Sequence, residues 1–112
     1  MDHRLNAERA ATLHRIASLT RQFDAIVESS ALTTNDDEHD PEGTTVAFER
    51  AQVSALLAWA KKHLVAVDQA ITRLLDGSYG VCGRCGQAIA EERLAALPVV
   101  ATCIGCTSRT RR

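Results

Sequence analysis

Four cysteines in the last third of the chain have the spacing that most clearly predicts chemistry. They occur as Cys82-x2-Cys85 and, after 17 intervening residues, as Cys103-x2-Cys106. Two residues between thiolates allow one tight turn to present both sulfurs to the same ion, and two such turns supply the four ligands of tetrahedral Zn²⁺. A site with four sulfur ligands leaves no position for a water molecule. We therefore expect one structural zinc ion and no catalytic one.

Redox chemistry is the alternative for a C-x-x-C pair, because such a pair can act as a dithiol. The second pair, at zinc-ribbon spacing, favours the metal. Gly83, Gly86 and Gly105 lie in or beside the turns, where a positive φ is often required. The segment between the first and last cysteine has few large apolar side chains. Zinc binding is therefore expected to supply its folding energy, on the order of 10 kcal/mol. Arg84 and Arg93 are placed to offset the negative charge of the thiolates.

The zinc segment must be positioned by what precedes it, and the first predicted element is a helix from about Arg4 to Ser29. Its apolar residues recur mostly at steps of three or four, as in a helix with one buried stripe. These residues are Leu5, Leu13, Ile16, Leu19, Phe23, Ile26 and Val27.

A second, longer helix is predicted from about Thr45 to Asp76, ended by Gly77 in a left-handed conformation. Two interleaved registers, each with a seven-residue repeat, form its apolar seam, and only Arg50 interrupts them. The registers are Val46, Val53, Ala60, Val67 and Leu74, and Arg50, Leu57, Leu64 and Ile71. Trp59 flanks this seam, and we expect it to pack at the edge of the helix pair.

A helix of roughly 48 Å with so narrow a stripe cannot bury itself in a domain this small, so it needs a partner. We expect a mainly α fold, an antiparallel two-helix coiled-coil hairpin joined to a small C4 zinc finger. The hairpin would occupy residues 1–76, with an acidic tip loop around 30–44. The finger, with a short basic tail, would occupy residues 77–112. Homodimerisation through the same stripe is the competing arrangement.

The expected tip is strongly acidic. Between positions 28 and 42 there are six carboxylates and no Lys or Arg, namely Glu28, Asp36, Asp37, Glu38, Asp40 and Glu42. A solvated loop that keeps the hairpin soluble would have the same composition. Asp40 followed by Pro41 is a plausible N-cap and first helical residue, but Thr44 or Thr45 would cap the second helix equally well.

Composition excludes several classes of protein. Thirteen basic and 14 acidic residues give a net charge of -1, which does not support nucleic-acid binding through bulk positive charge. No segment approaches the roughly 20 apolar residues of a membrane helix. The N-terminal sequence has no apolar run that could serve as a secretion signal, so we expect a cytoplasmic protein.

The zinc segment contains a set of residues at fixed spacing, namely Tyr79-Gly80-Val81-Cys82-Gly83-Arg84-Cys85-Gly86, Ile89, Arg93-Leu94, Ala96, Pro98 and Cys103-Ile104-Gly105-Cys106. In these residues it resembles the DksA/TraR family of bacterial regulators that act on RNA polymerase. Upstream, Asp37-Glu38-His39-Asp40 is similar to the Asp-x-x-Asp at the tip of the family's hairpin, and Phe48 follows at a comparable distance. The first helix is similar only in kind.

The resemblance implies a mechanism without catalysis. Proteins of this family insert the hairpin into the secondary channel of RNA polymerase and change the lifetime of promoter complexes, and they do not read a DNA sequence. Asp37 and Asp40 would be the polymerase-contacting tip residues, and Arg93 is a further candidate for polymerase contact. We expect a monomer.

Three features differ from the family pattern. Glu42 occupies the position where the family's tip motif usually has alanine, and Leu97 the position where well-known long members have an arginine thought to contact guanosine tetraphosphate. Those members also continue into a helix after the last cysteine, whereas this sequence stops at Arg112. We therefore do not expect a response to that nucleotide.

No catalytic motif emerges from the remaining residues, which contain no Ser/His/Asp set and no phosphate-binding glycine loop. We do not expect an enzyme. The alternative function is a zinc-ribbon protein that binds nucleic acid and dimerises through its coiled coil.

Overall fold

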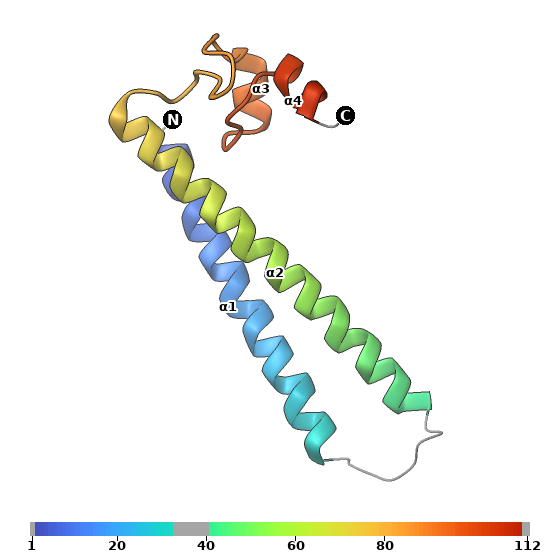
Figure 1. The fold of residues 1–112 in the computed structure, drawn as a ribbon. Helices are drawn as coiled ribbons and strands as arrows, with labels where there is room; N and C mark the ends of the chain where they lie inside the picture. Colours follow the sequence, from blue (N-terminus) through green and yellow to red (C-terminus); the bar gives the residue numbers. More distant parts are fainter. Residues whose placement is uncertain (1, 33–40, 111–112) are drawn as a thin grey trace. The chain divides into compact units, whose positions relative to one another are not determined.

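The structure, a computed structural model, describes residues 2–32 and 41–110 (Figure 1). Two long helices are followed by a small segment with two short ones. The four helices are α1 (Asp2–Leu32), α2 (Pro41–Asp76), α3 (Glu91–Ala96) and α4 (Ile104–Thr110). In these ranges the β-structure is a single antiparallel bridge between Val81 and Ala88. The expected fold class, a helical hairpin followed by a four-cysteine finger, is confirmed.

The chain divides into two compact units. One unit consists of residues Thr12–His63, which contribute the larger part of α1 and the first part of α2. The other combines the first residues, up to Ala11, with everything from Leu64 onward. The start of α1 and the end of α2 therefore belong to the same unit as the four cysteines. The helix α2 ends at Asp76, and the predicted division into domains 1–76 and 77–112 stays a prediction.

Both long helices extend further toward the loop than predicted, since α1 continues to Leu32 and α2 begins at Pro41. Proline suits the first helical position because its missing N–H would have no partner there and its φ is already helical. At the other end, Gly77 adopts a φ of 84°. The N–H groups of Ser78 and Tyr79 both donate to the carbonyl of Arg73 (2.9 and 3.1 Å). The predicted left-handed stop is confirmed.

The predicted seam of α2 is the buried side of that helix. Ala60 and Val67 are fully buried, and the other apolar seam residues are half-buried. Those half-buried residues are Val46, Val53, Leu57, Leu64, Ile71 and Leu74. Arg50, the one polar position of the pattern, is exposed.

The seam of α1 differs from the prediction at two positions. Leu5, Thr12 and Leu19 are buried, whereas Leu13 is 41% exposed and Val27 39% exposed. The buried residues are seven apart, and Leu13 lies one residue, about 100° of helix rotation, away from that line. The seven-residue repeat, and not the apolarity of each side chain, therefore determines which residues face α2. Thr12 occupies a seam position despite its hydroxyl.

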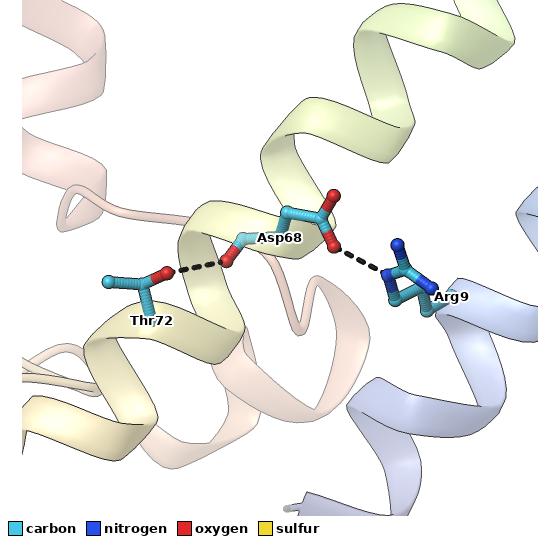
Figure 2. A network of polar contacts seen from close by, with 3 residues as sticks. All are labelled: Arg9, Asp68 and Thr72. Carbon is cyan, nitrogen blue, oxygen red and sulfur yellow. Dashed lines mark hydrogen bonds and ion pairs between the residues drawn. The ribbon is translucent and has the colours of Figure 1, made fainter.

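Polar contacts also join the two helices within each unit. Arg9 Nε, on α1, lies 2.7 Å from Asp68 Oδ1, on α2 (Figure 2). Within α2, Thr72 donates to the backbone carbonyl of Asp68. Both side chains of this ion pair are nearly half exposed, so we expect it to contribute no more than about 1 kcal/mol. In the other unit, the guanidinium carbon of Arg15 lies 5.8 Å from the ring centre of Trp59.

Among the helices that the structure describes, none is both long and apolar enough to cross a membrane.

Candidate metal centre

The four cysteines converge as predicted. Their Sγ atoms all lie within 4.8 Å of one another. A tetrahedral ion with Zn–S bonds of about 2.3 Å requires sulfurs roughly 3.8 Å apart, and Cys85 Sγ and Cys103 Sγ are separated by 3.7 Å. A disulfide would need about 2.05 Å, and none of the four cysteines forms one. The donor set therefore fits a C4 zinc site.

The first cysteine pair is held by a tight turn. The N–H of Cys82 donates to the carbonyl of Gln87 (2.8 Å), and the N–H of Gly86 donates back to the carbonyl of Cys82 (3.0 Å). Within this turn the N–H groups of Arg84 and Cys85 point at Cys82 Sγ, at 3.4 and 3.5 Å. Gly86 has a φ of 75°, as expected from its type.

A positive φ was also predicted for Gly83 and Gly105, the other two glycines beside the cysteines, and that prediction was wrong. The glycines with positive φ in the described chain are Gly77, Gly80 and Gly86. A Cβ on Gly80, whose φ is 87°, would lie 3.6 Å from Leu94 Cδ1, which is an ordinary contact. Gly80 is therefore required for its backbone conformation and not for space.

The second cysteine pair lies at the start of α4. Cys103 precedes this helix and Cys106 is in its first turn, where the N–H of Thr107 donates to the carbonyl of Cys103 (3.0 Å). The two turns are joined because the N–H of Gly83 donates to the carbonyl of Ala101 (2.9 Å). Backbone hydrogen bonds therefore position both pairs.

The surroundings favour thiolate formation unequally. Backbone N–H groups, those of Cys85 first and Cys103 second, lower the pKa of the Cys82 thiol to about 6. The backbone N–H of Cys106 lowers the pKa of Cys103. The pKa of Cys106 is raised to about 12, chiefly because its side chain hydrogen-bonds to that of Cys103. A divalent cation reverses this last preference, since a coordinating thiol loses its proton.

A small core lies beside the sulfurs. Cys82, Ile89 and Cys106 are buried, and Leu94, Val100 and Cys103 pack against them. Two of the three buried residues are metal ligands, and α3 has no buried residue of its own. So small a core cannot offset the conformational entropy of ordering the segment, which is why the metal is needed for folding.

Arg93, predicted as a candidate polymerase contact, connects α3 to the second cysteine turn. Its Nε donates to the carbonyl of Thr102 (3.0 Å) and its Nη2 to Thr107 Oγ1 (3.0 Å). The two threonine hydroxyls share a further hydrogen bond. The side chain is half-buried. The contacts of Arg93 are therefore those of a residue that supports the finger, and its contact with polymerase stays a prediction.

Three contacts that the sequence did not predict lie between the finger and the helix ends beside it. One is within the finger, and two attach the end of α2 and the start of α1 to it. The Tyr79 hydroxyl donates to the carbonyl of Pro98 (2.9 Å), and Arg73 Nη2 donates to the carbonyl of Val99 (3.3 Å). Arg4 donates to the carbonyl of Ala95. The acceptors are backbone carbonyls of the last residues of α3 and of the irregular segment that follows, so the pairing depends on the folded path of the chain and has no signal in residue type.

The predicted tip residues Asp37 and Asp40 lie outside the described residues, as does most of the acidic run. Their role stays a prediction.

Comparison with known proteins gives the finger a family. Residues 77–112 match the profile of the prokaryotic dksA/traR C4-type zinc finger. Among solved structures, transcription factor DksA2 from Pseudomonas aeruginosa superposes with a TM-score of 0.61 at 25% identity, covering 96% of this chain and 82% of that one. The four clustered sulfurs are accordingly the ligands of one structural zinc ion.

Curated relatives match over shorter segments. General stress protein 16O from Bacillus subtilis is 32% identical over 71 residues, which are 63% of this chain and 44% of that protein. An uncharacterised protein from Aquifex aeolicus is 39% identical over 46 residues, 41% of this chain and 32% of that protein. The chain thus spans less than half the length of these relatives. The finger, residues 77–112, is thus of the dksA/traR C4 type, and the fold of the chain is similar to that of a DksA2 transcription factor.

Proposed function

We propose that this chain is a bacterial transcription regulator that binds RNA polymerase and inserts the tip of its hairpin into the secondary channel to modulate initiation. The observation that carries the proposal is the match of 96% of the chain to a DksA2 transcription factor, finger and helices together. The chain would act as a monomer in the cytoplasm, where its partner works.

The construction of the finger supports a mechanical role. With four sulfur ligands, the zinc ion has no open position for water or substrate, so its contribution is to the fold. Arg4 and Arg73 bind the finger to the first residues of α1 and the last residues of α2 within one compact unit. The base of the hairpin is therefore fixed to the finger, as a protein that works by presenting its other end requires.

The acidic tip would carry the effect on transcription. Asp37 and Asp40 would reach the neighbourhood of the polymerase active centre, where carboxylates can meet Mg²⁺ or basic groups. Because the net charge is -1, we propose no direct reading of a DNA sequence.

Binding to purified bacterial RNA polymerase tests the proposal. The labelled chain should bind polymerase, and a protein known to occupy the secondary channel should displace it. Binding that persists under saturating competitor would place the chain elsewhere on polymerase. Salt-sensitive binding to DNA without polymerase would favour the zinc-ribbon alternative, because phosphate contacts release counterions.

A further inference from the structure

A group of exposed apolar side chains lies on α2 away from the seam. Trp59 is 59% exposed and Leu56 39% exposed. With Arg15, Gln52 and Ala55 they line a groove of about 480 Å³, which we name the Trp59 surface. The chain has four aromatic residues, and one of them, the large apolar side chain of Trp59, does not contribute to the buried seam.

Helical spacing extends this surface by one turn. Phe48, which is 69% exposed, precedes Gln52 by four residues, and Gln52 precedes Leu56 by four. Residues at such steps lie on the same face of a helix. Phe48, Leu56 and Trp59 therefore form one stripe, and none of them occupies a position of the seam that packs against α1.

Trp59 is held in place while its ring stays accessible. The His63 ring stacks on it with the ring centres 5.7 Å apart and an interplanar angle of 2°. Arg15, from α1, lies over the same indole at 5.8 Å. A side chain fixed by two neighbours loses little further freedom on binding, which is a property of interface anchor residues, among which Trp and Arg are enriched.

The Trp59 end of the stripe is positively charged. Arg15 contributes one charge, and the exposed Lys62 follows Trp59 by three residues, so it lies on the same face. A complementary surface would combine an apolar centre with carboxylates beside the indole.

The size of the stripe indicates what kind of partner covers it. From Phe48 to Trp59 it is about 17 Å long and about 10 Å wide, a footprint of roughly 170 Å². A stable pair of proteins needs about 800 Å² on each side. The stripe is too small to hold a second copy of this chain, but it suits one contact within a larger interface.

We propose that the Trp59 surface docks on RNA polymerase, against an apolar protein surface edged by carboxylates. This inference rests on the proposed function, and it adds an affinity site on the side of the hairpin that is separate from the acidic tip. The tip would alter transcription, and the Trp59 surface would contribute to holding the chain on the enzyme.

Affinity for purified polymerase, measured for full-length variants, tests the proposal. Trp59→Ala should raise the Kd about tenfold or more, since truncation of an anchor residue costs at least that factor. Lys62→Glu should also weaken binding. Val65→Ala is the matched control, because Val65 is an apolar residue of α2 that is 56% exposed but lies off the stripe, and its Kd should change less than about twofold.

A measurement on the unaltered sequence avoids any effect of Trp59→Ala on folding. Trp59 is the one tryptophan of the chain, so a fluorescent tryptophan analogue reports on this position alone. Polymerase should protect the analogue from a soluble quencher.

The outcomes separate this inference from the proposed function. If the wild-type chain does not bind polymerase, the proposed function fails and this inference fails with it. If the wild type binds but Trp59→Ala binds equally well, or the analogue stays as open to quencher as in the free chain, only the Trp59 surface is refuted. Dimerisation of the free wild type that Trp59→Ala abolishes would also refute it, in favour of a second copy.

Discussion

Replacing Arg93 by alanine should weaken zinc binding about 30-fold without touching a ligand. The side chain donates two hydrogen bonds of 3.0 Å, one to the carbonyl of Thr102 and one to Thr107 Oγ1. Bonds from a charged donor contribute about 1.5–3 kcal/mol each when buried, and this side chain is half-buried, so we take about 1 kcal/mol for each. Because folding of the finger is coupled to metal binding, the loss of about 2 kcal/mol appears as weaker zinc affinity.

Two further variants show how much each hydrogen bond of Arg93 contributes to zinc affinity. Thr107→Val removes one acceptor and should weaken zinc binding about fivefold, and combining it with Arg93→Ala should cost less than the sum of the two. Glu92→Ala, an exposed neighbour on α3, is the control and should leave the affinity unchanged. The assay is competition for zinc with a chromophoric chelator. Wild-type affinity in Arg93→Ala would refute the supporting role and leave polymerase contact as the function of this arginine.

The remaining predictions concern the ligands, the pH and one glycine. Cys82→Ser should abolish stoichiometric zinc and unfold the finger while the hairpin keeps its helicity; full zinc content by atomic absorption would contradict the C4 assignment. The pKa of Cys82 is lowered from 9.0 to about 6, so the stabilisation from its ionisation is complete above pH 9 and is lost as the pH falls through about 6. Because the finger unfolds without zinc and its thiols then have their ordinary pKa values, zinc affinity should fall steadily as the pH is lowered from about 9. An affinity that stays constant down to about pH 6 would contradict the coupling of folding to metal binding. Gly80→Ala should destabilise the zinc-bound finger by about 1 kcal/mol because the φ of Gly80 is 87°. Gly83→Ala is the control and should not destabilise the finger, because its added Cβ would meet nothing closer than 3.6 Å. Equal melting temperatures of the two variants would contradict this prediction.

The sequence was sufficient to predict the parts of the fold that follow from periodicity. The seven-residue repeat of α2 identified its buried side, and Gly77 identified its end. The repeat was harder to read in α1, where Leu13 is more apolar than Thr12 but Thr12 lies on the line of Leu5 and Leu19. Apolarity of a single residue cannot decide between neighbours on a helix, because only the register fixes which of them faces the partner.

The metal centre was predictable from cysteine spacing, but its supports were not. Spacing specifies four sulfurs and two turns, whereas the carbonyls that receive Arg73, Arg93 and Tyr79 come from irregular backbone whose path no local pattern encodes. The exposure of Trp59 was likewise hidden, since a tryptophan beside a seam is usually covered.

The lifetime of promoter complexes formed by RNA polymerase, measured with the wild type and with a double variant at the tip, tests the central proposal most directly. At equal occupancy of polymerase, the wild type should change the lifetime, and the chain carrying Asp37→Ala and Asp40→Ala should bind but leave the lifetime as it is without regulator. An unaltered effect of the double variant would contradict the proposed action of the tip.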